Sequence, residues 1–425
     1  MKNDIMKIKQ ILKMRMIKYD YKICILNPDD TINYEIPSSD IVYDSISYSE
    51  NLQNGQRKSL SFNLINQSGK YTPSVNTQRG YYEIFYNNNY EKIENYKLNN
   101  SFTKTPLWGP VRVSFEIGLR ISETEQKWFK KGIYILSSMN AESNQGKKQV
   151  SLTFKDKYSL FEGKTGKLLV GTEIPAGSDC VMVIKDLLRQ DYGMGYSYDL
   201  LSPLIDISFN GMKTSTSIRK EAGDTVASIF DDLGTQMNAE YYYNDDGIFR
   251  FSPINEILLD EHKPICYEYS ENDGDLINVS NDYNFDEAIN MIKVVGNNID
   301  DRIHYALVVN DDPRSPISVS NIGKRLGDII SDVNVWSDTI AQDTGRYYLR
   351  KNSVSCMTTN VVAKLNPLVE LDKLITIIHS DFNFKKEKFI VNSISYSSGS
   401  LEMNIGVTNI QHLTFLKAGD KDYEY

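Results

Sequence analysis

The stretch GDTVASIFDDLGTQMNAEYYYNDDGIFRFSPI, residues Gly223–Ile254, is where the interpretation of the whole chain begins. Its apolar residues recur at intervals of three and four, which predicts one buried face of a helix: Val226, Ile229, Phe230, Leu233 and Met237. Asp224 or Thr225 can cap the start of this helix by accepting a bond from a free backbone N–H. Asn238 tolerates the left-handed conformation that commonly ends a helix.

Two strands joined by a tight hairpin are expected directly after this helix. The strands are Ala239–Tyr243 and Ile248–Phe251, and Asn244–Gly247 supplies the positive-φ positions of the turn. Pro253 is expected to end the second strand. The acidic pair Asp231-Asp232 falls on the outer face of the helix, where solvation accounts for it. The unit is a helix packed on a β-hairpin, and its residues do not suggest catalysis.

Length and composition limit the kinds of protein that this chain can be. Its 425 residues suffice for roughly two to four domains, and a hydrophobic content of 40% indicates sizeable cores. The net charge of −9 argues against a general nucleic-acid binder, which needs a basic surface. The cysteines stand singly, without CxxC spacing or a nearby histidine, so we interpret them as small core residues of a protein from a reducing compartment: Cys24, Cys180, Cys266 and Cys356.

Residues 1–18 form a basic segment that is interpreted as an N-terminal arm or helix. Lysines and an arginine interrupt every apolar run, so the segment lacks the hydrophobic region of a signal peptide. As a helix it would carry one apolar face, although an ordered first strand or a loose arm is equally compatible with the sequence: Met6, Ile8, Ile11, Leu12 and Met16. No stretch approaches the ~20 apolar residues of a membrane span, so no contact with a membrane is expected.

Alternating apolar and polar residues predict a β-rich segment from Tyr19 to Phe161, typical of a barrel or sandwich. The residues 87–101 are rich in Asn and Lys and are interpreted as an exposed or mobile loop. The composition of Phe161–Gly177 indicates a linker. The expected strands of this part are Tyr21–Asn27, Thr31–Ile36, Ile41–Ser49, Arg57–Ile65, Val111–Ile121, Gly132–Ser138 and Gln149–Asp156.

A second β-rich segment is predicted from Leu276 to Val407, after a region in which helices and strands alternate. That region holds a helix at Ser178–Gln190, a strand at Leu204–Phe209 and the opening helix and hairpin, so Ser178–Ile254 can be two similar halves of a small α/β domain. The later expectations are strands at Leu276–Asn284, Ala288–Val295 and Val354–Leu365, a helix at Trp336–Lys351 and a final hairpin at Lys388–Val407.

Several of these segments carry motifs that resemble the baseplate hub proteins of contractile phage tails and of phage-tail-like bacteriocins (tailocins) of Gram-positive bacteria. One motif departs from the family pattern, because Leu371 stands where glycine is usual. The turn at that point is therefore expected to differ. The motifs are the helix and hairpin closing in Phe251–Pro253, Ile117-Gly118-Leu119 with Trp128 and Gly132–Leu136, Lys155–Tyr158, Tyr283–Gly296, Ser315–Arg325 and Asn366–Ile377.

The resemblance implies a mainly β fold with an α/β insert, in which two tail-tube-like β-barrel domains flank a small α+β domain. After the arm at 1–18, the expected domains are a barrel at 19–165, an α/β domain at 166–265 and a second barrel at 266–425. The second barrel is expected to include an inserted loop region and one helix.

In function, the resemblance implies the structural hub of a contractile tail baseplate. Such a hub is a homotrimer whose six barrels join the hexameric tail tube, or a tube-initiator protein, to the trimeric central spike. Its lumen admits the genome or the tape measure, so DNA is only transiting cargo, and wedge proteins of the baseplate are further partners. Assembly is expected in the bacterial host cytoplasm, in the virion or tailocin baseplate. The alternative is a cell-wall-degrading or receptor-binding tail protein.

A search of the sequence for chemistry predicts no catalytic, cofactor-binding or metal site. The four histidines stand alone, and neither a GxSxG nucleophile elbow nor an HExxH helix occurs: His262, His304, His379 and His412. Asp311-Asp312, like Asp231-Asp232, is an acidic pair of the kind that glycoside hydrolases require at a set separation. Asn272–Asp275 is oxygen-rich but lacks a full calcium loop, and Gly193–Gly195 lacks the GK[ST] of a phosphate loop, so both are interpreted as turns.

Overall fold

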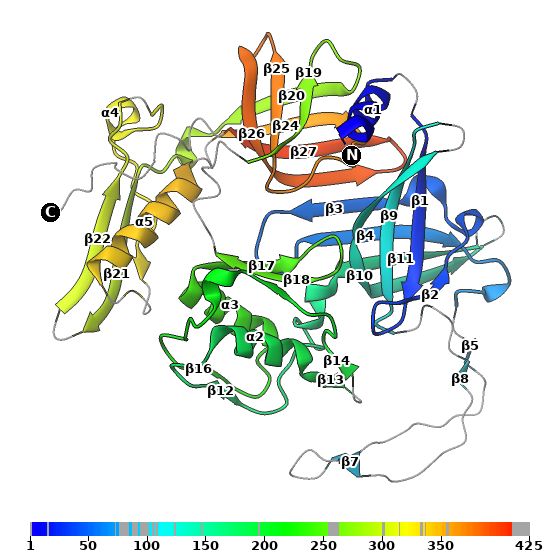
Figure 1. Ribbon diagram of the computed structural model, residues 1–425, viewed down its shortest axis with the longest axis horizontal. Helices are drawn as coiled ribbons and strands as arrows, with labels where there is room; N and C mark the ends of the chain where they lie inside the picture. Colours follow the sequence, from blue (N-terminus) through cyan, green and yellow to red (C-terminus); the bar gives the residue numbers. More distant parts are fainter. Residues whose placement is uncertain are drawn as a thin grey trace.

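The computed structural model describes the chain from residue 2 to residue 409, with gaps. The described residues are 2–14, 17–72, 74–75, 85–86, 92–93, 102–103, 107, 109–122, 125–144, 146, 148–193, 196–253, 263–299, 302–313, 315–331, 335, 337–353 and 357–409. The fold is mostly β, and its largest element is a 13-stranded sheet that runs through both β-rich segments. Figure 1 shows this sheet with a mixed α/β unit against it and a small helix-covered sheet at one end.

The first half of the large sheet is built from residues 19–156. Its strand order is β2-β1-β9-β10-β11-β4-β3, and every neighbouring pair is antiparallel. Side chains alternate between buried and exposed along most of these strands, as expected for a sheet with one face on a core. The strands are β1 (Tyr19–Leu26), β2 (Ile32–Glu35), β3 (Ser47–Asn51), β4 (Lys58–Ile65), β9 (Arg112–Arg120), β10 (Gln126–Ser143) and β11 (Lys148–Asp156).

The second half has the strand order β19-β25-β26-β27-β24-β20, and it joins the first half where β26 pairs with β3. A single sheet therefore continues from one half into the other. Its strands are β19 (Ile265–Ser270), β20 (Leu276–Tyr283), β24 (Met357–Lys364), β25 (Leu374–His379), β26 (Phe384–Ser397) and β27 (Glu402–Asn409).

The two halves repeat one strand order. Taken in chain order, β1, β3, β4, β9, β10 and β11 occupy the same sheet positions as β19, β20, β24, β25, β26 and β27. Each set of six strands forms five pairs of neighbouring strands. In four of these, the pair in the first half and the corresponding pair in the second half are both antiparallel. The fifth differs, because β1 and β9 are antiparallel whereas β19 and β25 are parallel.

The long strands β10 and β26 repeat even their irregularities. In β10 the pairing shifts between Lys130 and Gly132 on the β9 edge, and between Leu136 and Ser138 on the β11 edge. In β26 the pairing shifts between Lys385 and Glu387 on the β25 edge, and between Val391 and Ser393 on the β27 edge. The two shifts are six residues apart in both strands. Because β-bulges bend a strand at a fixed place, the match aligns Ser138 of β10 with Ser393 of β26.

One hydrophobic core serves both halves of the large sheet. It joins residues of β1, β4, β9 and β11 with residues of β19, β24, β25, β26 and β27. Helix α1 (Lys2–Leu12) belongs to it, since Ile8 and Leu12 are buried there. Lys13, just after α1, pairs with Asp273 at 2.6 Å, and Lys364 Nζ donates to the Met14 carbonyl at 2.9 Å. The N-terminal segment is thus a helix fixed to the second half.

The α/β unit has its own core and contains the helix and hairpin of the opening stretch. Helix α3 (Val226–Met237) buries Phe230 and Leu233 completely, Thr225 caps its start, and Asn238 ends it at φ 48°. These expectations are confirmed. The other elements are β12 (Thr172–Ile174), α2 (Cys180–Arg189), β13 (Asp191–Gly193), β14 (Tyr196–Ser197), β15 (Leu204–Ile205), β16 (Ile218–Lys220), β17 (Ala239–Tyr243) and β18 (Phe249–Pro253).

Two expectations for the α/β unit were wrong in detail, and a third was confirmed. In the turn Asn244–Gly247 only Gly247 has a positive φ, of 73°, and a Cβ there would lie 2.5 Å from Ile133 Cδ1. Pro253 ends the second strand as expected, although the strand runs two residues past the expected end at Phe251. The strand expected at Leu204–Phe209 ends at Ile205, because Asp206 caps a 3-10 turn at Ile207–Phe209.

A third unit is inserted between β20 and β24. It consists of the sheet β22-β21-β23, against which α5 packs, and it has a separate core. The strand expected at Ala288–Val295 was assigned to the second barrel, but β21 lies in this separate sheet. The elements are β21 (Met291–Ile299), β22 (Arg302–Val309), α4 (Val319–Ile322), β23 (Ile330–Ser331) and α5 (Asp338–Ser353).

The sequence indicates Ile340, Thr344, Tyr347 and Tyr348 as the inward-facing residues of helix α5. Ile340 and Tyr348 do pack against the core of the unit, and the buried residues of the helix are Ala341, Gly345 and Leu349. A Cβ on Gly345 would lie 2.7 Å from Val308 Cγ2. Glycine therefore allows the helix to approach β22 closely, in addition to weakening it as a helix former.

The expected loop at 87–101 lies mostly outside the described residues. Its described part, Lys92–Ile93, is strand β7, which pairs with β6 (Phe85–Tyr86). Two further short strands, β5 (Ser74–Val75) and β8 (Phe102–Thr103), pair with each other.

Candidate functional site

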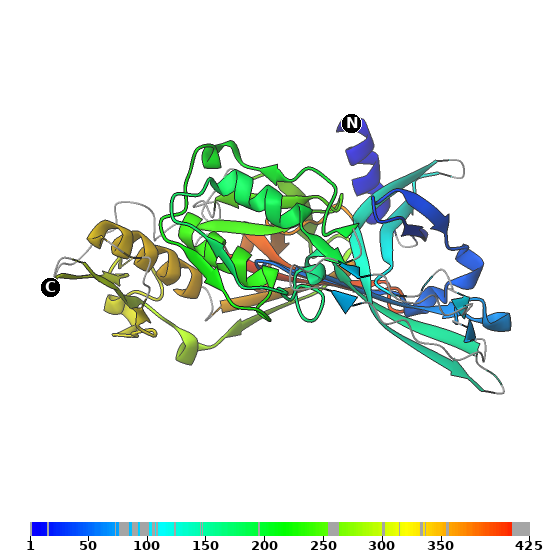
Figure 2. The ribbon, with the colours of Figure 1, turned by 90° about the horizontal axis from the view of Figure 1, so that it is seen from below.

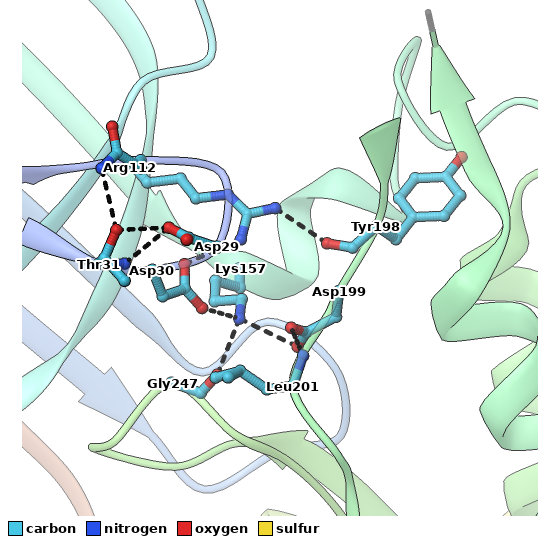
Figure 3. Close-up of polar contacts among 10 residues, drawn as sticks. Asp29, Asp30, Thr31, Arg112, Lys157, Tyr198, Asp199, Leu201 and Gly247 are labelled. Carbon is cyan, nitrogen blue, oxygen red and sulfur yellow. Dashed lines mark hydrogen bonds and ion pairs between the residues drawn. The ribbon is translucent and has the colours of Figure 1, made fainter. Parts of the chain in front are cut away.

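A buried cluster of charged side chains joins the first half of the large sheet to the α/β unit, and its centre is Lys157. This side chain has no exposed surface. Its Nζ donates to Asp30 Oδ2 at 2.7 Å and to the Gly247 carbonyl at 2.9 Å, and it forms an ion pair with Asp199 Oδ2 at 3.0 Å. Figure 3 shows these three groups converging on Lys157 from separate segments. One ammonium group thus ties the β1–β2 turn, the β14–β15 connection and the β17–β18 hairpin together.

Arg112 completes this cluster. Its guanidinium donates to Asp30 Oδ1 at 2.8 Å and to the Tyr198 carbonyl at 3.0 Å (Figure 3). The backbone N–H of Leu201 donates to the second carboxylate, Asp199, at 2.9 Å. Two buried cations therefore balance two buried carboxylates. These paired charges join the first half of the large sheet to the α/β unit.

A second charged cluster lies nearby, around Lys58 and Asp156. Lys58 is paired with Asp245 of the hairpin turn and with Glu50 at 3.7 Å. Asp156 is buried and accepts the backbone N–H groups of Arg57 and Lys58 at 2.7 and 2.9 Å. Burial raises the pKa of Asp156 to about 6, although these N–H donors oppose the shift. Like Lys157, this cluster holds the hairpin against the large sheet.

A cleft of about 660 Å³ opens where the two halves and the α/β unit meet. Its walls include Arg57 from the first half, Glu240 from the α/β unit, and Lys263 and Asp372 from the second half. Arg57 pairs with Glu240 at 3.1 Å and stacks on the Tyr242 ring at 3.4 Å, and Lys263 pairs with Asp372. Ligand sites are mostly apolar with a few convergent polar groups. This cleft instead has charged walls, in which Arg57 with Glu240 and Lys263 with Asp372 form ion pairs.

The departure from the family motif at Leu371 lies in the wall of this cleft. The left-handed residue of that turn is Asp372, at φ 60°. Next to Leu371, an aspartate therefore takes the conformation that glycine adopts most easily.

The two histidines that the structure describes each lie beside a carboxylate of another segment. His304 Nδ1 lies 2.9 Å from Asp338 Oδ1, and Arg302 also pairs with Asp338, so this contact fixes β22 to the start of α5. His379 lies 3.6 Å from Glu271 and packs on the Phe382 ring. His262 and His412 lie outside the described residues.

The acidic candidates also have structural partners. Asp232 pairs with Lys220 at 2.9 Å, and the exposed Asp231 accepts a hydrogen bond from the buried Tyr241 hydroxyl. Solvation alone therefore does not account for Asp231. Asp311 and Asp312 both have interactions that leave neither of them free. Across the described ranges, no three His, Cys, Asp or Glu side chains are grouped so as to hold a metal ion.

Of the two turns weighed as binding motifs, Asn272–Asp275 is fully described and Gly193–Gly195 only in part. In Asn272–Asp275 the buried Asp275 accepts the Tyr267 hydroxyl at 2.5 Å, so this turn ties β19 to β20 and, through Asp273, to Lys13. Burial raises the pKa of Asp275, while the bond from Tyr267 opposes the shift. Of Gly193–Gly195, only Gly193 is described, at the end of β13.

The cysteines agree with the interpretation as core residues where they are described. Cys24 and Cys180 are buried, Cys266 is partly buried, and all three are free. Burial raises the pKa of Cys180 to about 12, which leaves its thiol protonated and unreactive at neutral pH. Cys356 lies outside the described residues.

The sequence analysis did not single out Asp30, Arg112, Lys157 or Asp199. Lys157 falls inside the family motif Lys155–Tyr158, which is the one signal that pointed toward it. The other three lie far apart in the chain, and only the folded structure brings them together. Within the described part of the chain, no helix is both long and apolar enough to cross a membrane.

Comparisons with known proteins show that the chain is similar in fold to solved tail proteins. No protein-family model matches the sequence, and no curated protein matches it. The 43 kDa tail protein of prophage MuSo2 from Shewanella oneidensis is 12% identical, with a TM-score of 0.56 over 93% of this chain and 99% of its own. The tail protein from Neisseria meningitidis MC58 is 10% identical, with a TM-score of 0.58 over 93% and 98%. Over almost its whole length, the chain thus has the fold of these two tail proteins.

Proposed function

We propose that the chain is a structural tail protein, and that it serves as the hub of a contractile tail baseplate. The observation that carries this proposal is the repeated strand order of the two halves in one continuous sheet. The likeness of fold to two tail proteins supports the coarser part, a tail component. The finer part, a hub from a phage or tailocin of Gram-positive bacteria, rests on the sequence motifs.

The repeat suits a component that joins two symmetries. If each half is one tube-like domain, three chains supply six similar domains, and these can stack on a hexameric tube. The same three chains present threefold symmetry to a trimeric spike. Proposed partners are therefore the tail tube or its initiator, the central spike, the tape measure and the wedge proteins. Closed rings of this kind arise from heterologous contacts between identical chains.

A structural role is also favoured by the polar residues of the domain junctions. Lys157, Arg112, Lys58 and Arg57 all pair with carboxylates of other segments. Buried ion pairs of this kind fix the arrangement of the parts that they join. A component that transmits force through a tail needs its domains held in a fixed arrangement.

The proposal is tested by the mass of the purified protein in light scattering. Three chains per particle are expected, either for the protein alone or after co-expression with its spike neighbour. A chain that stays monomeric under both conditions would contradict the hub. A zymogram on host cell walls separates the cell-wall-degrading alternative, since a hub without enzymatic activity leaves no zone of clearing.

A further inference from the structure

The two halves of the chain meet where β3 pairs with β26, and the strand equivalent to each of these two has an unpaired edge among the described residues. Inside the chain, β3 pairs antiparallel with the last part of β26, from Ser393 to Ser397. The same edge of β26 is occupied by β25 as far as Ile390. β26 thus holds two successive partners on one edge, and the second of them comes from the other half.

The equivalent edge of β10 is open. β9 pairs with β10 as far as Ile135, which matches Ile390 in the bulge alignment. From Ser138 to Ser143, β10 pairs only with β11 among the described residues. Asn140, Ala141 and Glu142 are exposed there, whereas Tyr396, the counterpart of Ala141, is buried against β3.

The counterpart of β3 is open as well. β20 holds the place of β3 in the second half and is the last strand of the sheet. Its outer edge has no strand partner within the described ranges. Tyr283 on this strand is 51% exposed. An unpaired strand edge exposes a row of backbone N–H and C=O groups and is a template for another strand.

We propose that β20 of one chain pairs antiparallel with Ser138–Ser143 of β10 in a second copy, as β3 pairs with β26 within the chain. The partner is this same protein, because each open edge is the counterpart of one side of an existing contact. Figure 2 shows the β10–β11 hairpin (teal) projecting at one end of the molecule and β20 (lime green) running toward the other. The contact is therefore head to tail, and repeating it gives a closed ring if the rotation between successive copies closes.

The bulges fix the register of this pairing. Tyr396 lies three positions after Ser393, the first paired residue beyond the bulge in β26, and Ala141 lies three positions after Ser138, the first beyond the bulge in β10. Within the chain, Tyr396 lies opposite Tyr48. The position of Tyr48 in β3 corresponds to Asn281 in β20. Following the paired residues across β4 and β11 leads from Tyr48 to Leu136 of β10, and following them across β24 and β27 leads from Asn281 to Val391 of β26. The bulge alignment matches Leu136 with Val391.

Ala141 of one copy therefore lies opposite Asn281 of the next. Two residues along, Met139 lies opposite Tyr283 in the same antiparallel register. The half-exposed Tyr283 ring would then be covered by a methionine side chain, a favourable sulfur–aromatic contact. Asn140 lies opposite Asp282 on the other face.

The experiment is disulfide cross-linking of the full chain. Two double variants place cysteines in register, Ala141→Cys/Asn281→Cys and Asn140→Cys/Asp282→Cys. Adjacent opposed pairs alternate between hydrogen-bonded and non-hydrogen-bonded types, so one of the two has the shorter separation that a disulfide needs. All four positions are surface or partly buried ones, and the described native cysteines are buried or partly buried. The matched control, Ala141→Cys/Ile277→Cys, uses an exposed residue of the same strand four positions out of register.

After mild oxidation, at least one in-register variant is expected to give covalent multimers on a non-reducing gel, at least ten times more than the control. The number of chains in the ring rests on the proposed function, whereas the strand pairing does not. A trimer in light scattering without cross-linking above the control would overturn the β20–β10 contact and leave the hub proposal standing. Particles that cross-link in register but do not contain three chains would support the contact and contradict the hub. A monomer under every condition, including co-expression with the spike, would overturn both.

Discussion

Asp231 and Asp232 are neighbours in sequence, but they have different surroundings on α3. Asp232 makes an exposed pair with Lys220, which is the kind of interaction that contributes little. Asp231 accepts the hydroxyl of Tyr241, a side chain that is 2% exposed. Removing the acceptor leaves a buried hydroxyl without its partner, and such a group costs free energy.

Asp231→Ala is therefore expected to lower the free energy of unfolding by about 1–3 kcal/mol. Asp232→Ala should change it by less than about 0.5 kcal/mol. Chemical denaturation of both variants measures this difference. The double variant Asp231→Ala/Tyr241→Phe is the control, because removing the hydroxyl as well should recover part of the loss. Equal stability of the two single variants would contradict the role of Asp231.

Asp156 gives the protein a pH dependence of known sign. Its pKa rises from 3.8 to about 6 on folding, chiefly because the carboxyl group is buried. Its contribution to stability is therefore full below pH 3.8 and is lost as the pH rises through 6, by about 3 kcal/mol. The comparison of wild type with Asp156→Asn isolates this group. Between pH 4 and 7 the difference in unfolding free energy should shift in favour of the variant, and a constant difference would contradict the raised pKa.

These residues also show which side-chain environments the sequence can predict. The periodicity of α3 predicted which residues are buried, since burial on a helix follows from local spacing. It did not predict that Asp231 bonds to Tyr241, or that Lys157 meets Asp30 and Asp199. Those contacts depend on how separate elements approach each other, and the spacing of residues within one element gives no information about that.

Among the elements, α3 is the one whose packing makes the clearest prediction. Leu233 has no exposed surface and lies in the core of the α/β unit with Phe230 and Phe249. Leu233→Ala should lower the free energy of unfolding by about 2–5 kcal/mol, from lost burial and from the cavity left behind. Leu200→Ala is the matched control, because that leucine is 61% exposed. Thermal or chemical denaturation should separate the two variants, and equal stabilities would contradict the packing.

The elements divide into those that local signals predicted and those that they did not. The helix α3, its caps and the hairpins β17–β18 and β26–β27 follow from patterns within about 30 residues. Strand β21 was predicted as a strand, but it was assigned to the wrong sheet. Its partners β22 and β23 carry no mark in the sequence that distinguishes them from strands of the large sheet.

At the scale of the whole molecule, the repeat was expected from the family resemblance. Comparison of β10 with β26 shows why sequence alone reveals it poorly. In the bulge alignment the two strands share a Phe-Lys-Lys run, 129–131 with 384–386, and also Ile135 with Ile390 and Ser138 with Ser393. Many residues satisfy the alternating burial of a strand, so the strand order can persist while the sequence changes.

A ring of this protein should also have a lumen that does not retain DNA. The chain carries 56 acidic against 47 basic residues, and phosphates bind where lysine and arginine cluster. Residues that face the axis should therefore be net acidic or polar, with basic residues turned toward the rim. An even spread of the acidic excess is the alternative. The checks are the signed charge of axis-facing residues in the assembled ring and DNA retention at low salt, where a basic axis or tight binding would contradict the prediction.

The central claim is that two repeated halves let three chains form a ring with six similar sectors. Electron-microscopic class averages of the purified assembly, viewed down its axis, test this most directly. The account predicts a closed ring of three chains in which six lobes alternate between first and second halves. Isolated monomers, an open filament, or a closed ring with any other number of chains would contradict it.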